Sequence, residues 1–246
     1  QALPDHQYAK QAMFRLGETA YLSGDAKNAR RNLRDFQQKF PNDPLGAFAL
    51  PYLGELALAA GDSDDAKTWF VKALRNHGNS PLMDDCRYGL ARALHIQGDT
   101  VSATKFYEYL MAKDDCPLAD DAALQLGMVQ YNNQQYARAA QTFATFDSQW
   151  KQSDLLSKAR YWQGMSQRAQ GQWQTAAQTL TAAVQADPRH ENADSVNYYA
   201  AESWRKAGRL GDAARHYQRV ISDWPDSQWD DDSLLADALM EGFEAA

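Results

Sequence analysis

The feature that most constrains this 246-residue sequence is an internal repeat of 36 or 37 residues. One small residue recurs in each unit and serves as its reference position. These anchor residues are Gly17, Gly54, Ala91, Gly127, Gly164 and Ala201. A period of this length is typical of arrays in which each unit buries its apolar face against its neighbours.

Three further columns keep a constant distance from the anchor. Seven residues after it stand Gly24, Gly61, Gly98, Gln134, Gly171 and Gly208. Twelve residues after it stand Ala29, Ala66, Ala103, Ala139, Ala176 and Ala213. Sixteen residues after it stand Leu33, Phe70, Tyr107, Phe143, Leu180 and Tyr217. Glycine tolerates the positive φ that ends a helix, and residues four apart share one helical face, so each unit is predicted to be helix A, a tight turn and helix B.

The columns predict an all-α solenoid of about six such units that forms one domain over residues 1–246. The predicted units are 10–43, 47–80, 84–117, 120–153, 157–190 and 194–227. A further amphipathic helix is predicted over 229–244, with Leu234, Leu235, Ala238, Leu239 and Phe243 on one face. It either covers the last unit, because an open solenoid end exposes core, or opens a seventh unit.

These columns resemble the tetratricopeptide repeat (TPR) family over residues 10–244, and the resemblance implies a right-handed α-solenoid. Pro41, Pro188 and Pro225 supply the family's proline at the end of helix B in three units. The period exceeds the family's value of about 34 residues, which implies longer linkers. Linkers 39–44 and 223–227 are similar to those of bacterial envelope members, which include the Tol-associated cell-division coordinator and the outer-membrane barrel-assembly lipoprotein.

One column departs from the family. Three residues after the anchor the family often has Tyr, whereas this sequence has Ala20, Ala57, Leu94, Gln130, Gln167 and Trp204.

The resemblance also implies where a partner binds, because helix A lines the inner, concave wall of the family's solenoid. The candidate residues on that wall are Phe14, Tyr21, Tyr88, Arg92, His95, Tyr131, Tyr161, Arg168, Tyr198 and Arg205. Tyr and Arg are enriched at the centres of protein interfaces. We therefore expect a non-catalytic scaffold that binds a protein or peptide. The alternative is that several of these aromatic residues pack between neighbouring A helices.

Charge and motifs argue against other function classes. The net charge of −7 and the pI of about 5.2 disfavour nucleic acid and anionic membrane surfaces, which need clustered Lys and Arg. The apolar stretch 45–61 is short for a membrane span and contains Pro51 and Glu55. No phosphate-binding glycine motif or nucleophile–base pattern is present, so neither an enzyme nor a cofactor is predicted.

The cysteines Cys86 and Cys116 match no metal-binding spacing. Each is predicted near one end of the third helix pair, and those ends lie side by side in an antiparallel pair. A disulfide is therefore geometrically feasible, and two buried free thiols are the alternative.

Three points of biology stay open at this stage. The chain begins at Gln1 without Met, which indicates either a processed mature protein or an accessory domain excised from a larger one. The first option favours a periplasmic or otherwise exported protein, and a cytoplasmic location is the alternative. Solenoids also associate through their ends or convex faces, so a self-associating structural role competes with partner binding.

Overall fold

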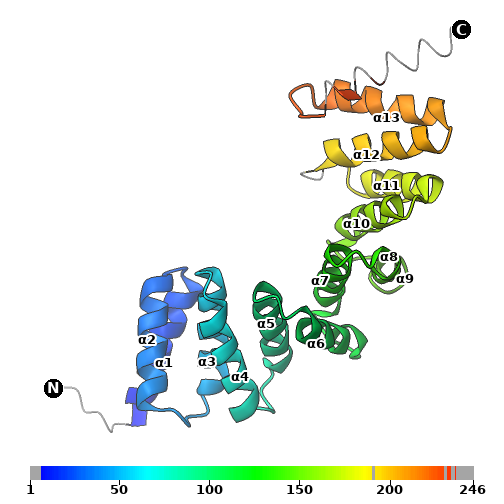
Figure 1. Cartoon of the computed structure of the whole chain (residues 1–246). Coiled ribbons are helices and arrows are strands. Elements are labelled where there is room, and N and C mark those ends of the chain that lie inside the picture. Colours follow the sequence, from blue (N-terminus) through cyan, green and yellow to red (C-terminus); the bar gives the residue numbers. More distant parts are fainter. Residues whose placement is uncertain (1–6, 190–191, 230–231, 234–235, 237–246) are drawn as a thin grey trace, which may run out of the picture. The chain divides into compact units, whose positions relative to one another are not determined.

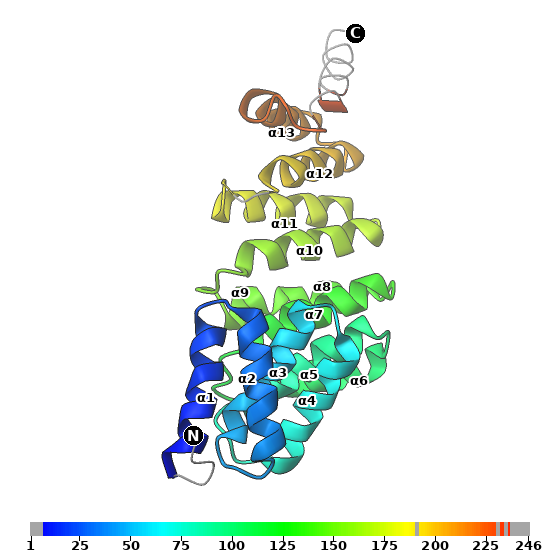
Figure 2. The ribbon, with the colours of Figure 1, turned by 90° about the vertical axis from the view of Figure 1, so that its left-hand side faces the viewer.

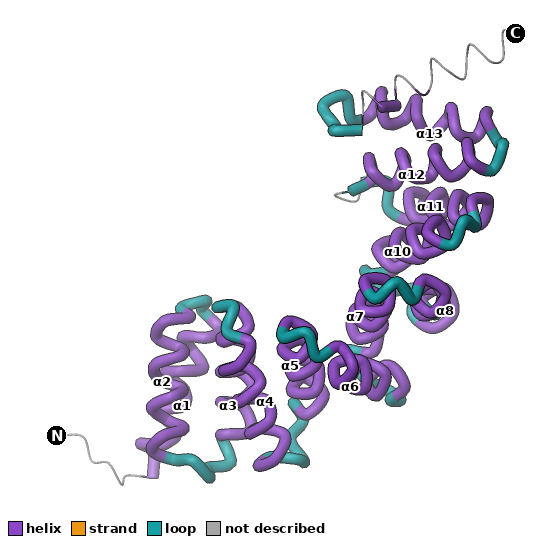
Figure 3. The backbone as a smooth tube through the Cα atoms, in the orientation of Figure 1, coloured by secondary structure: helices purple, strands orange, loops and turns teal. Residues whose placement is uncertain are grey.

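The computed structural model describes residues 7–189, 192–229, 232–233 and 236, and all of the regular secondary structure in them is helical (Figure 3). The A helices are α1 (Gln7–Leu22), α3 (Gly46–Ala59), α5 (Met83–Ile96), α7 (Ala119–Asn132), α10 (Leu156–Ala169) and α12 (Ala193–Lys206). The B helices are α2 (Ala26–Lys39), α4 (Ser63–Asn76), α6 (Thr100–Ala112), α8 (Tyr136–Ala144) with its short continuation α9 (Phe146–Gln149), α11 (Trp173–Ala186) and α13 (Leu210–Asp223).

Each A helix packs on the B helix that follows it, which confirms the predicted all-α array of helix pairs (Figure 1). The contacts divide the chain into two units, Gln1–Ala122 and Ala123–Ala246, and the boundary falls inside α7. In unit 1, α2 also packs on α3, and α4 packs on α5. Unit 2 repeats this arrangement, and Figure 2 shows α10, α11, α12 and α13 lying one above the next. A single solenoid over the whole chain and its handedness stay predictions.

The turn between helices A and B has the predicted backbone conformation. Five of the turn glycines have positive φ, from 72° at Gly171 to 82° at Gly98. Gln134 fills the same place in the fourth pair and adopts a φ of 59°. The repeat therefore imposes a left-handed turn residue even where glycine is missing, at a cost in strain that glycine avoids.

Aspartates after three of the glycines start the B helices of unit 1. The side chains of Asp25, Asp62 and Asp99 each accept a hydrogen bond from the backbone N–H three residues later, at 3.0 to 3.1 Å. Each therefore satisfies one of the N–H groups that a helix start leaves without a partner.

The core lies where the small residues of the anchor and alanine columns contact the large apolar residues sixteen positions after the anchor. All six alanines of the second column are fully buried. The ring of Phe70 on α4 is also fully buried and lies against Gly54 of α3 and Gly89 of α5. A Cβ added at Gly54 would come within 2.6 Å of this ring. The glycines therefore allow the close approach of the three helices.

The structure bears on the predictions for the two cysteines and for the last helix. Cys86 and Cys116 are both buried and unbonded, which corresponds to the free-thiol alternative. Most of the helix predicted over 229–244, including Leu234, Leu235, Ala238, Leu239 and Phe243, lies outside the described residues.

Candidate binding surface

Unit 2 gathers six aromatic side chains on and beside its A helices. We call Tyr131, Tyr161, Trp162, Tyr198, Tyr199 and Trp229 the aromatic surface. All six are half-buried. They come from α7, α10, α12 and the segment after α13, so three consecutive repeats contribute to one surface.

The first half of the aromatic surface joins α7 to α10. The ring of Tyr131 meets Trp162 edge to face at a centroid distance of 5.0 Å, and Trp162 meets Tyr161 at 5.2 Å. Tyr136 supports Tyr131 from the start of α8 at 5.3 Å. Edge-to-face contacts at these distances are favourable and fix the rings relative to one another.

The second half joins α12 to Trp229. Tyr198 stacks on Trp229 at 4.5 Å, and Tyr199 meets the same indole edge to face at 5.2 Å. Tyr198 also contacts Tyr217, which is fully buried on α13. The rings of this half are therefore held by the core beneath them.

Arg168 of α10 links the two halves. Its Nη1 donates to the carbonyl oxygen of Tyr199 at 2.8 Å and to Ser203 Oγ at 2.7 Å. Its guanidinium lies 4.9 Å from the centroid of the Tyr199 ring, within the range of a cation–π interaction. Burial lowers the pKa of Arg168, although an arginine stays charged at neutral pH. The surface therefore holds a half-buried positive charge among its rings.

The carboxylate of Glu202, which interacts electrostatically with Arg168, also has other partners. Both oxygens of Glu202 on α12 accept hydrogen bonds from Arg205, at 3.0 and 2.9 Å, and Tyr217 donates to the same group. Burial alone would raise the pKa of Glu202, but the bonds from Arg205 and Tyr217 lower it below the ordinary value. Glu202 and Arg205 thus form a pair that neutralises itself.

The hydroxyls of Tyr131, Tyr161 and Tyr198 remain protonated at neutral pH. Burial raises the pKa of Tyr131 and of Tyr198, and raises that of Tyr161 to about 12. A neutral phenol both donates and accepts hydrogen bonds. Each ring thus presents an apolar face and a polar tip.

Unit 1 places the other candidate residues in smaller groups. Tyr21 stacks on Tyr52 with their centroids 4.4 Å apart. Arg92 pairs with Glu55 at 3.0 Å and lies over the ring of Tyr88. His95 is half-buried near the end of α5. The candidates of this unit are therefore partly engaged with neighbouring A helices.

Phe14 does not belong to the binding surface, although it is one of the predicted candidate residues. The sequence predicts it on the binding wall, but the structure leaves it only 2% exposed. Its ring packs on Phe36 of α2 at 5.8 Å and on Phe48 of α3 at 6.4 Å. The prediction is wrong for Phe14, because the α1–α2–α3 junction uses this position as core.

Family comparison decides how this array is classified. Tetratricopeptide repeat models match residues 53–113 and 161–228, and a second such model matches 11–43 and 121–153. The chain belongs to the tetratricopeptide repeat family. No curated protein sequence matches it.

Solved TPR structures share the fold at low sequence identity. The C-terminal part of a TPR protein from Cytophaga hutchinsonii aligns with a TM-score of 0.75 and 15% identity, over 91% of this chain and 84% of that one. Pseudomonas aeruginosa pilF aligns at 0.66 and 14%, over 95% and 96%. YrrB, described as a TPR protein with an unusual peptide-binding site, aligns at 0.60 and 17%, over 83% and 96%.

Sequence reasoning missed half of the aromatic surface in this TPR array. Trp162 and Tyr199 stand two residues before their anchors, as Tyr52 does in unit 1. These aromatic residues are spaced by the repeat, so this column was visible in the sequence. Trp229 lies beyond the last repeat, and no column points to it.

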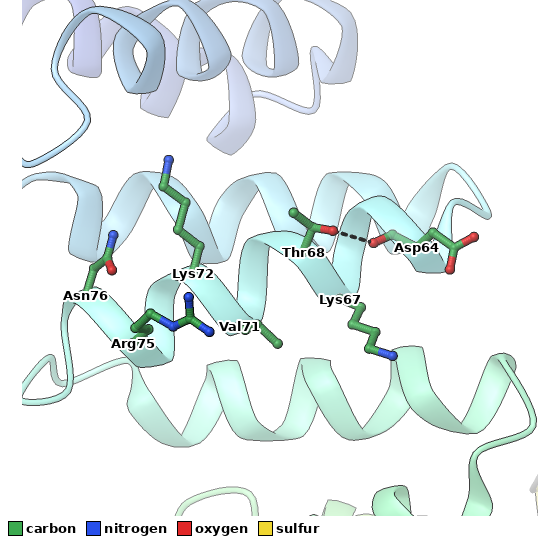
Figure 4. Close-up of a pocket in the computed structure, with 7 residues that line it drawn as sticks. All are labelled: Asp64, Lys67, Thr68, Val71, Lys72, Arg75 and Asn76. Carbon is green, nitrogen blue, oxygen red and sulfur yellow. Dashed lines mark hydrogen bonds between the residues drawn. The ribbon is translucent and has the colours of Figure 1, made fainter.

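A different, basic surface lies on the TPR helix α4 of unit 1. Its cavity of about 600 Å³ is lined by Asp64, Lys67, Thr68, Val71, Lys72, Arg75 and Asn76, and Figure 4 shows their side chains along the one helix. Gln97 bonds both Lys67 and Asp64, at 3.5 and 2.8 Å, and Lys72 lies over the Trp69 ring. The cavity is shallow, and four of its polar side chains interact within the protein, so it is a weaker candidate than the aromatic surface.

Metal-binding groups and membrane-spanning helices are both absent from the part of the chain that the structure describes. Within it, no three His, Cys, Asp or Glu side chains are grouped closely enough to hold a metal ion. Within it, too, none of the TPR helices combines the length and the apolar character that crossing a membrane requires.

Proposed function

We propose that this TPR protein is a non-catalytic scaffold that binds a peptide or protein segment along the aromatic surface of unit 2. The observation that carries the proposal is a group of six half-buried rings together with Arg168: five rings lie on three consecutive A helices, and Trp229 lies beside them after α13. Trp, Tyr and Arg are the residue types that dominate binding energy at protein interfaces.

The physical state of the rings supports this assignment. Each ring is held by at least one other ring, so little side-chain entropy is lost when a partner binds. Half-buried aromatic residues still expose part of an apolar face, and covering it is favourable. The TPR fold is a type of protein-interaction scaffold, and YrrB is a member with a peptide-binding site.

The test is affinity capture from an extract of the native source with three baits. The first bait is the wild-type chain, and the second carries Trp162→Ala with Tyr199→Ala. The third, a matched control, carries Gln178→Ala with Gln218→Ala, two exposed positions on the B helices of the same unit. Circular dichroism should give the same helical signal for all three.

We expect a protein that the wild type and the control retain and that the aromatic variant loses. Hot-spot aromatic residues cost about 2 kcal/mol or more when truncated, which corresponds to roughly thirtyfold weaker binding. Equal retention by all three baits would refute the assignment, because the binding site would then lie elsewhere.

A second candidate function is self-association through unit 1. Leu16, Leu22, Ile96 and Val101 are each more than 60% exposed there. Light scattering during gel filtration over a range of concentrations tests this role. A mass that rises with concentration supports it, and a constant monomer mass rejects it.

We further propose a bacterial envelope location, on the similarity of linkers 39–44 and 223–227 to those of envelope TPR proteins. Fractionation of the native source with an antibody against this chain tests it. Recovery in the cytoplasmic fraction alone would contradict it.

A further inference from the structure

A cavity of about 250 Å³ in unit 2 is lined by residues of α11, α12 and α13, and it shares no lining residue with the aromatic surface. Six of its lining residues are Thr181 and Gln185 of α11, Trp204 of α12, and Arg215, His216 and Arg219 of α13. Side chains four residues apart lie on the same face of a helix, so Arg215 and Arg219 stand side by side in one wall.

A hydrogen-bonded network forms the floor of this cavity. Asn197, which is fully buried, donates from Nδ2 to the carbonyl oxygen of Ala193 at 2.8 Å and turns its Oδ1 toward His216. His216 Nδ1 lies 2.9 Å from that oxygen, so Nδ1 carries the proton and Nε2 is an acceptor. The Thr181 hydroxyl lies 3.1 Å from Nε2 and donates to it, and it accepts from Trp204 Nε1 at 3.2 Å. Each of these side chains therefore has a partner, and together they hold the floor in one arrangement.

The rim of the cavity carries more positive charge than its own carboxylate neutralises. The carboxylate in its lining is Asp212, and both Arg209 and Arg215 form ion pairs with it. Among the described residues, the side chains of Arg219 and Gln185 form no hydrogen bond or ion pair. Three arginines and one aspartate leave two positive charges here, in a chain whose net charge is −7.

The titration of His216 reflects this positive charge. Burial and, after it, the charges of Arg219 and Arg215 lower the pKa of His216 to about 4. Asp212 raises that pKa, but by less than either arginine lowers it. The groups that face His216 from α11 and α12 are an alcohol and an amide, which do not titrate. The arginines therefore act on the floor of the cavity, where their charges favour an anion.

We propose that this cavity binds a phosphate group, which Arg215 and Arg219 hold above the floor formed by His216 and Thr181. A phosphate monoester carries a charge of roughly −1.5 to −2 at neutral pH and three strong acceptor oxygens. This charge matches the two uncompensated positive charges, whereas a carboxylate supplies one charge and two oxygens. The cavity is larger than a phosphate ion, so room remains beside Trp204 for the organic part of a phosphate monoester.

The floor provides a readout for the bound ion. A negative charge next to an imidazole favours its protonated form, so phosphate in the cavity raises the pKa of His216. When Nε2 becomes protonated, it donates to the Thr181 oxygen, which has a second lone pair for this bond. A phosphate that binds elsewhere on the chain leaves this pKa unchanged.

Isothermal titration calorimetry of the full chain measures the binding of two probes, inorganic phosphate and phenyl phosphate, at about 150 mM sodium chloride. The proteins compared are the wild type, Arg219→Gln and Arg138→Gln. Arg138 is the matched control, because it is an exposed arginine on α8, a B helix of the same unit, and forms no ion pair among the described residues. Nuclear magnetic resonance measures the pKa of His216 with and without phosphate, and His216→Gln assigns the signal.

We expect the wild type and Arg138→Gln to bind phosphate at one site with a Kd in the millimolar range. Arg219→Gln should bind at least about tenfold more weakly, because it loses a charge-assisted hydrogen bond. Phosphate should raise the pKa of His216 until the site is saturated. Tighter binding of phenyl phosphate than of inorganic phosphate would assign the site to a phosphate monoester, and equal binding would assign it to the free ion.

Three results would overturn the proposal: no saturable binding of either probe, equal binding by Arg219→Gln and the wild type, or a pKa of His216 that phosphate leaves unchanged. The comparison of His216 with and without phosphate uses the wild type alone, so it does not depend on how well a variant folds. None of these results bears on the aromatic surface, which is tested separately.

Discussion

Replacing Gly89 by Ala sets two effects of similar size against each other. The helix gains stability, because alanine is favoured over glycine in a helix interior by about 1 kcal/mol. The added methyl group, however, overlaps the ring of Phe70, which is fully buried and also lies against Gly54. Overpacking a core in this way costs about 1 to 3 kcal/mol. We therefore expect Gly89→Ala to lower the free energy of unfolding by up to about 2 kcal/mol.

The matched control is Gly211→Ala on α13, where an added Cβ would meet nothing within 4 Å. It should raise the free energy of unfolding by about 0.5 to 1 kcal/mol. Urea unfolding followed by circular dichroism measures both variants. Adding Phe70→Leu to Gly89→Ala should cost less than the two single changes together, because the smaller side chain relieves the overlap. If Gly89→Ala is as stabilising as Gly211→Ala, the packing argument fails.

Three further predictions follow from local contacts. Burial lowers the pKa of His216 to about 4, so the folded state binds fewer protons than the unfolded one. The free energy of unfolding should therefore fall as the pH drops from about 6.5 to about 4. If the free energy of unfolding of a His216→Gln variant falls by the same amount over this range, the prediction is contradicted. Asp62→Ala removes the side chain that accepts a hydrogen bond from the Asp65 backbone N–H at the start of α4, and it should lower the free energy of unfolding, measured in urea, by about 1 kcal/mol. An unchanged free energy of unfolding would show that this cap does not stabilise the helix. Burial raises the pKa of Cys86 to about 12, so a thiol reagent should label Cys86 only after urea unfolds the chain. Rapid labelling of Cys86 in the folded protein would contradict its burial.

The fold was largely predictable because its determinants are local and repeated. A left-handed turn residue, an aspartate cap and a small-to-large pair on one helix face each act within a single unit. Even the exception, Gln134, obeys the turn geometry that its neighbours in the column define.

The binding surface was only partly predictable, for a geometric reason. Adjacent residues on a helix point about 100° apart, so the columns two and three residues before the anchor both border the predicted binding face of helix A. Packing between repeats decides which of the two is buried. Phe14 is core, whereas Tyr161 and Trp162 both line the surface.

The surroundings of Arg168 could not be predicted from its own unit. Its partners, Tyr199 and Ser203, lie more than thirty residues further along the chain on α12. Sequence spacing identifies Arg168 as a residue of helix A but does not reveal that Glu202 is already occupied by Arg205.

Photocrosslinking tests the central claim, that a partner binds on the A helices of unit 2, most directly. A photoreactive phenylalanine analogue replaces Trp162 on α10 in one protein and the exposed Gln178 on α11 in another. Irradiation in the native extract should join a partner to the first protein and not to the second. Crosslinks from position 178 alone would contradict the account, because they would place the partner on the B helices.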